Sequence, residues 1–136
     1  MTREVLIRAH LNAFLDQLRL DSILQGATYA DEVTGSPGLY CVVNLNNGDR
    51  FGDRSTGADE SAIFRASVRS VGRTRDQAQL IAEHVFAQSM NVRLVVPGRI
   101  LTRIKHGGGQ PTQEDDSVNP PLWFASDIFT FRSDPA

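Results

Sequence analysis

Carboxylates are the densest group of side chains that could carry chemistry in this 136-residue chain. One set includes Asp49 and Asp53, and another is the run Glu114-Asp115-Asp116. Their oxygens could bind Mg²⁺ or Ca²⁺ and support a small metal-dependent hydrolase. The first set does not match a calcium-binding loop, which needs alternating ligands and glycine at the sixth position. Neighbouring acids are more often a solvated charge run, so we expect no metal and keep the hydrolase as the weaker alternative.

Other kinds of catalytic site are poorly supported by the sequence. Its three histidines are far apart and form no zinc-binding motif. The glycines 107–109 do not match a phosphate-binding loop, because no lysine and no helix start follow them. Cys41, the single cysteine, lies in an apolar run typical of a buried, inert thiol. We therefore expect a protein that is not an enzyme and has no cofactor.

Composition limits the class of protein further. The length fits one domain over residues 1–136, and a hydrophobic fraction of 40% is that of a globular chain. The 14 basic and 16 acidic side chains give a charge of −2, which provides no general attraction to nucleic acid or to an anionic membrane. No apolar run approaches the ~20 residues of a membrane span. These features predict a soluble protein from a reducing compartment.

Two helices are expected from apolar side chains at helical spacing. The first runs from Thr2, its predicted N-cap, to Leu20. The second follows Thr74-Arg75-Asp76-Gln77, a capping box in which the Thr74 and Gln77 side chains bond to each other's backbone N–H groups. Its apolar stripe consists of Ala78, Ile81, Ala82, Val85 and Phe86.

The strands are expected from alternating or continuous apolar runs. The run 62–69 alternates and the run 39–45 is apolar on both faces, which indicates a central strand. Further strands are predicted at 27–33, at 92–96 and 99–105 as a hairpin around Pro97-Gly98, and at 122–132. The remaining segments, 46–60 and 106–121, are predicted to be long loops, and Asn47-Gly48 leaves open a hairpin at the start of the first. We predict an α+β fold, a mostly antiparallel or mixed sheet with two amphipathic helices packed on one face.

Basic and acidic side chains also predict contacts between subunits. Arg65 and Arg69 lie on the polar side of the alternating strand. The simplest interpretation of such arginines is a solvated sheet face; the alternative is that they meet acidic residues of a neighbouring subunit, such as those in the 106–121 loop. The candidate interface residues are Arg65, Arg69, Arg99, Arg103, Lys105, His106, Gln110, Glu114, Asp115 and Asp116.

Several phrases of the sequence resemble one family of virus proteins. They are Val68-Arg69-Ser70-Val71-Gly72 followed by Arg73-Thr74-Arg75-Asp76-Gln77-Ala78, then Val96-Pro97-Gly98-Arg99, Ile104-Lys105-His106, Gln110-Pro111, Asp115-Asp116 and Pro120-Pro121-Leu122-Trp123-Phe124-Ala125. Over most of its length the chain resembles the tail terminator, or tail completion, proteins of long-tailed, non-contractile bacteriophages. The 46–60 loop has no counterpart in this resemblance.

The resemblance implies a structural protein of the virion, assembled in the host cytoplasm. Such subunits form a ring, generally a hexamer, which caps the head-proximal end of the tail tube and stops its polymerisation. The expected partners are further copies of the chain, the tail tube protein and the head–tail connector or neck protein, with DNA passing through the lumen unread and no membrane involved. A head-completion or neck protein is the alternative within the virion. We expect the 106–121 and 46–60 loops to make the contacts.

Overall fold

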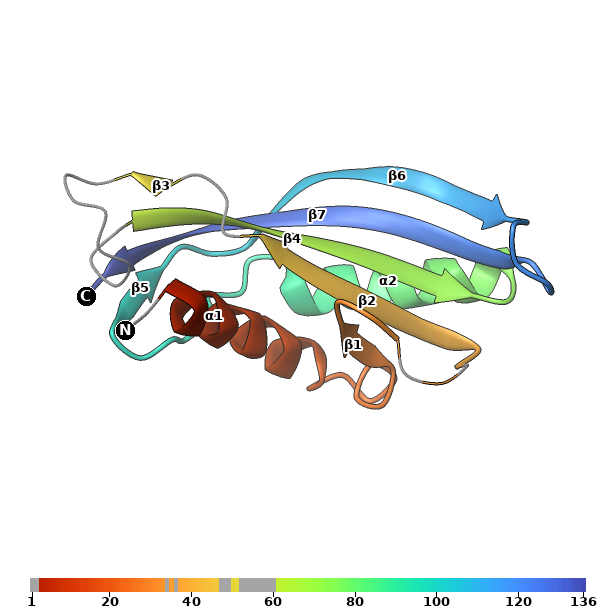
Figure 1. Cartoon of the computed structure of the whole chain (residues 1–136), viewed down its shortest axis with the longest axis horizontal. Coiled ribbons are helices and arrows are strands. Elements are labelled where there is room, and N and C mark those ends of the chain that lie inside the picture. Colours follow the sequence, from red (N-terminus) through yellow and green to blue (C-terminus); the bar gives the residue numbers. More distant parts are fainter. Residues whose placement is uncertain (1–2, 34, 36, 47–49, 52–60) are drawn as a thin grey trace.

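The computed structural model describes residues 3–33, 35, 37–46, 50–51 and 61–136, which form two helices and one sheet (Figure 1). The helices are α1 (Arg3–Leu18) and α2 (Arg75–Ser89). The strands are β1 (Thr28–Ala30), β2 (Leu39–Asn46), β3 (Arg50–Phe51), β4 (Ser61–Gly72), β5 (Arg99–Leu101), β6 (Lys105–Asp115) and β7 (Leu122–Pro135). The predicted α+β class is confirmed.

The sheet is mixed and is built around the long antiparallel pair of β4 and β7. Its order is β1-β2-β4-β7-β5, with β3 also bonded to β4 and β6 also bonded to β7. Only β1 and β2 run parallel among the described strands. Because β5 pairs with residues 133–135 and β6 with residues 122–130, these two strands follow one another along the same edge of β7. The predicted central position of β2 is right only for Cys41, Val42 and Val43, because β1 pairs with no other residue of β2.

The alternation in β4 separates a covered face of the sheet from an open face. Phe64, Ala66 and Val68 are buried, whereas Arg65 and Arg69 are exposed on the opposite side. Successive side chains of a strand point to opposite faces, so this pattern requires a core on one side only. The helices supply that core, as predicted.

Both helices pack on the covered face. Phe14 of α1 and Ile81 and Val85 of α2 lie in one apolar cluster with Phe64 of β4 and Phe129 of β7. The rings of Phe14 and Phe129 are 6.2 Å apart, which links α1 to β7. An apolar stripe on a short helix requires such tertiary cover, because the helix alone is marginal in water.

The tight connection from β4 to α2 depends on a glycine and a cap. A Cβ on Gly72 would lie 2.6 Å from the Cβ of Gln77, so only glycine fits between strand and helix. The Thr74 hydroxyl accepts a hydrogen bond from the Gln77 N–H at 3.2 Å, as the capping box predicts. The return bond differs from the prediction, because the Gln77 Oε1 accepts from the N–H of Arg73 rather than that of Thr74.

The prediction of a hairpin around Pro97-Gly98 is only half right. The turn is present, since the Arg99 N–H donates to the Val96 carbonyl at 3.0 Å. However, residues 92–96 form no strand, and β5 pairs with the end of β7 instead. β7 extends beyond the residues that pair with β6, and β5 forms its backbone hydrogen bonds with this last part of β7.

The prediction that 106–121 is a loop is wrong for most of its length. Residues up to Asp115 belong to β6, which follows β7 as an edge strand with two irregularities of register. A Cβ on Gly109 would displace the Asp127 carboxylate, and Gly108 has a φ of +131°, which favours glycine. Glycine and Pro111 are tolerated because an edge strand is bonded on one side only and the proline lies at a bulge.

Two other predictions concern residues outside the described part of the chain. These are the Thr2 cap and almost all of the 46–60 loop; within that loop the structure describes the short strand β3, paired with the start of β4.

Candidate assembly surface

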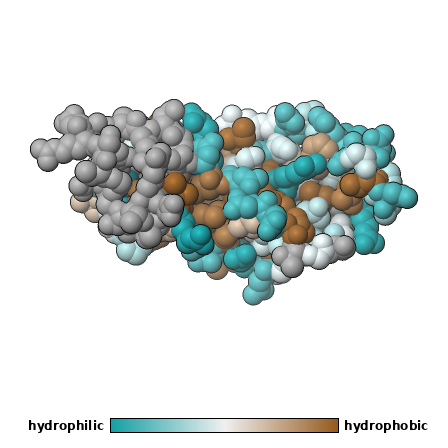
Figure 2. Space-filling view, viewed as in Figure 1, coloured by the Kyte–Doolittle hydropathy of each residue, from teal (hydrophilic) through white to brown (hydrophobic). Residues whose placement is uncertain are grey.

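The open face of the sheet is the main candidate for a functional surface. It is formed by the side chains of β2, β4 and β7 that point away from the helices, among them the paired residues Val42 and Arg69, and Val71 and Phe124. No helix covers this face within the described part of the chain. Figure 2 shows exposed apolar side chains in separate groups among hydrophilic ones, so charge and apolar contact are interleaved on the surface it displays.

An ion pair joins β4 and β6 across β7 on this face. The Arg69 Nη2 atom lies 3.8 Å from Asp115 Oδ2, and the Arg69 guanidinium stands 4.1 Å from the centre of the Phe124 ring. Hydrogen bonds from Ser117 lower the pKa of Asp115, and the Arg69 cation acts in the same direction. Arg69, which was expected to be either solvated or paired with a neighbouring subunit, therefore already has an acidic partner in its own chain.

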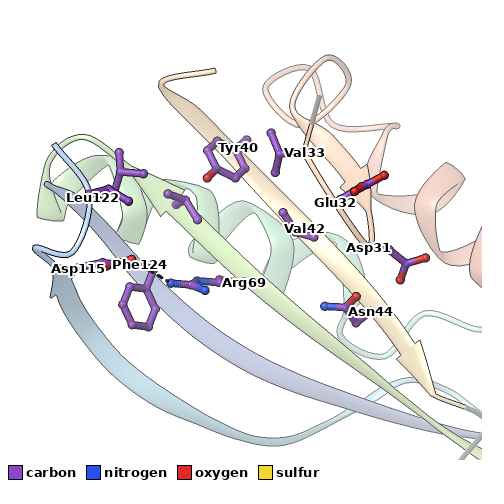
Figure 3. Close-up of a pocket in the computed structure, with 12 residues that line it drawn as sticks. Asp31, Glu32, Val33, Tyr40, Val42, Asn44, Arg69, Asp115, Leu122 and Phe124 are labelled. Carbon is purple, nitrogen blue, oxygen red and sulfur yellow. Dashed lines mark ion pairs between the residues drawn. The ribbon is translucent and has the colours of Figure 1, made fainter. Parts of the chain in front are cut away.

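A hollow of about 360 Å³ opens beside this ion pair (Figure 3). A second hollow, of about 280 Å³, adjoins the first. They share Val33, Tyr40, Val118 and Leu122, and we refer to them together as the hollow. Apolar side chains line much of it, whereas charge is added by Asp31, Glu32, Arg69, Arg73 and Asp115. This mixture of apolar side chains with a few polar and charged ones is typical of a binding pocket.

The β6 strand carries five of the predicted interface residues along the edge of the sheet. Lys105, Gln110 and Glu114 are exposed, and Asp115 is half-buried. His106 bonds to the Asp127 carboxylate through Nε2 at 2.8 Å. Asp116 follows the strand and is also exposed. The structure thus places these residues in a row along β6 and its end, whereas Lys105 had been expected on a hairpin strand and the others on a loop.

The arginines outside β6 occupy different environments. Arg65 is exposed on the open face opposite Thr130 of β7. Arg103 is exposed and donates to the Asn91 carbonyl at 3.1 Å. Arg99 is buried, and its guanidinium donates to the Ser133 hydroxyl and carbonyl at 2.9 and 3.0 Å. Arg99 therefore stabilises the interior of the subunit, a position that its sequence context did not reveal.

A buried histidine completes this interior polar cluster. His10 Nδ1 lies 2.7 Å from the Leu6 carbonyl, which can only accept, so this nitrogen carries the proton. His10 Nε2, 2.8 Å from the Ser133 oxygen, then accepts from the hydroxyl. Burial lowers the pKa of His10, with a further contribution from the Arg99 cation. Although a histidine beside a serine could activate a nucleophile, both side chains are fully buried and no substrate can reach them.

The described residues contain neither a cluster that could bind a metal ion nor a helix that could span a membrane. No cluster of three or more histidine, cysteine or acidic side chains there could hold a metal ion. Asp49 and Asp53, on which the hydrolase alternative partly depends, lie outside the described residues. Neither described helix is sufficiently long and apolar to cross a membrane.

Sequence reasoning missed the residues that shape the hollow. Tyr40 and Val42 were interpreted only as part of a central strand, and Leu122 and Phe124 only as part of the last strand. The signal was nevertheless present, because β2 has apolar residues on both faces although helices cover only one of them. In the structure Val42 is buried within the chain itself, whereas Tyr40, Leu122 and Phe124 stay half-buried and leave apolar surface open to a further contact.

Comparisons with known proteins add one finding about the fold. No protein-family model and no curated protein matches the chain. A chain from the virion of a native gene transfer agent particle matches with a TM-score of 0.66 and 21% identity, over 90% of this chain and 92% of that one. A second solved structure matches with a TM-score of 0.63 and 12% identity, over 100% of this chain and 98% of the other. At these identities the likeness shows that this chain shares its fold with a chain of a gene transfer agent virion.

Proposed function

We propose that this protein is a structural subunit of a phage-like virion, a tail terminator that forms a ring on the head-proximal end of the tail tube. The observation that carries the proposal is the fold shared with a virion chain over nearly the full length of both proteins. The resemblance of its sequence phrases to tail terminators supports the more specific role. The ring would stop polymerisation of the tube and present a surface to the head or neck.

The geometry of the subunit is suited to assembly. A ring needs a heterologous interface, in which one patch of a subunit meets a different patch of the next. The open face offers one such patch, and β6 offers a second, because its outer edge carries backbone groups that β7 does not use. A ring of six copies would use these surfaces six times, and the tube and neck proteins would contact its two ends.

The role of a non-enzymatic subunit agrees with the chemistry of the described residues. The side chains that could form a nucleophilic pair, His10 and Ser133, are sealed in the core. Some of the accessible charged groups, among them Asp31 and Glu32, lie around a hollow whose composition favours binding. DNA would pass through the ring without a specific site, since the chain has no basic excess.

Assembly of tail tubes in the presence of the purified protein tests this proposal. Tail tube protein is polymerised with and without this chain, and electron microscopy records tube length and the position of the bound protein. We expect shorter tubes with a cap at one end. Tubes of unchanged length with no bound protein would contradict the terminator role, and binding only to DNA-filled heads would favour a head-completion or neck protein instead.

A further inference from the structure

Two apolar side chains project from one end of the subunit without cover. Val95 is 85% exposed and Ile100 is 58% exposed, whereas their neighbours Val96 and Leu101 are buried. Val95 and Ile100 flank the turn that is closed by the bond from Arg99 to Val96, each one residue outside that bond. We call this pair the apolar knob. Isolated exposed apolar residues are common, but these two lie at matching positions on either side of one turn.

The hollow lies at the opposite end of the same sheet. Ile100 pairs with Asp134 near the end of β7, whereas Phe124 of the hollow lies near its start. Ten residues of extended strand separate these positions, a distance of roughly 33 Å. In Figure 1 the two ends are seen at β5, beside the termini, and at the start of β7. A knob and a hollow this far apart cannot fill each other within one chain.

The charges around the two features are complementary. Arg93 and Arg103, both exposed, lie on the segments that flank the knob. Asp31 and Glu32 are exposed beside the hollow, and no ion pair involves their carboxylates within the described part of the chain. Two arginines also line the hollow. Arg69 is already paired with Asp115, and Arg73 lines the smaller part of the hollow, which Asp31 and Glu32 do not line. Opposite charges around an apolar contact favour the correct partner and orientation.

We propose that the apolar knob of one copy seats in the hollow of the next copy, with Arg93 and Arg103 facing Asp31 and Glu32. This inference rests on the proposed ring and names the contact that would build it. The knob and the hollow are different patches, so each copy uses one of each and leaves the other free for a further copy. Such head-to-tail contacts close into a ring when the rotation between copies is suitable.

Thiol cross-linking tests the contact directly. Cys41 is the chain's only cysteine and is fully buried, so introduced thiols react without competition. Val95→Cys and Val118→Cys variants are mixed and treated with a short bis-maleimide at a concentration where wild-type oligomers are measured. Val118 is 40% exposed and lines the hollow. Apposed thiols have a high effective concentration, so we expect about tenfold more cross-linked heterodimer than in a control mixture.

The control replaces the knob by another exposed apolar residue. Leu20 is 74% exposed and follows α1, away from both features in the sequence, so a Leu20→Cys variant is mixed with Val118→Cys. Equal cross-linking in the control and test mixtures would overturn the inference. Equally strong cross-linking of Val95→Cys with itself would also overturn it, because that result indicates a symmetric contact.

Light scattering of the wild-type protein separates this inference from the proposed function. Rings without the Val95–Val118 cross-link would mean that the ring forms through another surface, which refutes only the knob contact. The cross-link without closed rings would support the contact and refute the ring. If the hollow instead receives a segment of the tube or neck protein, the test mixture should give no more cross-linked heterodimer than the control mixture. That result likewise overturns the contact between copies.

Discussion

Arg69 of β4 and Asp115 of β6 approach to 3.8 Å although β7 lies between their strands, and the ring of Phe124 on β7 lies beneath the arginine. These three side chains therefore connect three strands on the face that the helices leave open. A half-exposed ion pair adds little to stability, since water screens it. The ion pair instead shapes the hollow beside it, because both charged residues line that hollow.

Reversal of the charge at this position is expected to impair assembly and spare folding. An Arg69→Glu variant places a carboxylate beside Asp115 and removes the cation from the Phe124 ring. Because the Arg69 side chain is 48% exposed, the thermal midpoint of the variant should stay within about 3 °C of that of the wild type. Size-exclusion chromatography with light scattering should show loss of oligomers. Arg75→Glu, an equal charge change in the first turn of α2, should assemble normally.

Substitution of Gly72, in the turn between β4 and α2, tests how closely the helix packs against the sheet. Gly72→Ala adds a Cβ that would meet Gln77 and the Ala78 nitrogen at 2.6 and 2.7 Å, and it should destabilise the protein by about 2 kcal/mol. Gly26→Ala adds a Cβ with no atom within 4 Å and should have little effect. Urea denaturation of both variants measures the difference, and equal stabilities would contradict the packing at Gly72.

The cap of α2 should contribute measurably to stability. Thr74→Ala removes the acceptor of the Gln77 N–H and should cost about 1 kcal/mol. Gln79→Ala, at an exposed position of the same helix, should change stability little. Thermal unfolding followed by circular dichroism compares the two, and a Thr74→Ala variant as stable as Gln79→Ala would argue against the cap.

The buried His10 should make the protein less stable in mild acid. Burial lowers the pKa of His10 in the folded state, so the unfolded chain takes up a proton first as the pH falls. This contribution is complete above the unfolded pKa of about 6.5 and declines as the pH falls below it, by up to about 1.4 kcal/mol per pH unit.

Urea denaturation from pH 8 to pH 5 measures this dependence. A His10→Phe variant should lose the part of the slope that begins near pH 6.5. It should also be less stable at pH 8, because the Ser133 O–H loses its acceptor and the Leu6 carbonyl loses its side-chain donor. An unchanged slope in His10→Phe would show that another group is responsible.

Local sequence patterns predicted the elements that are stabilised by neighbouring residues, and those in which buried and exposed side chains alternate regularly. The alternation of β4 and the capping box at Thr74 identify a strand, a turn and a helix, and the structure contains all three. The β6 strand could not be predicted in this way, because its glycines, Pro111 and polar residues have low strand propensity. It is a strand because β7 supplies a long ladder of backbone partners, and β7 follows β6 in the sequence by a turn.

The candidate surface was predictable only in part, because it too depends on pairing between strands that are separate in the sequence. The charged residues of β4 and β6 were found from the sequence, but their convergence depends on register across β7. The hollow requires side chains from both ends of the chain, such as Tyr40 and Leu122, and the buried Arg99 depends on Ser133 thirty-four residues away. Such long-range pairings are set by the whole fold rather than by any one segment.

The mass and shape of the purified protein in solution test the central claim most directly. Size-exclusion chromatography with light scattering over a range of concentrations, combined with negative-stain imaging, should show a closed ring with about six times the mass of one chain. A protein that remains monomeric at every concentration, and that binds no tail tube, would contradict the account.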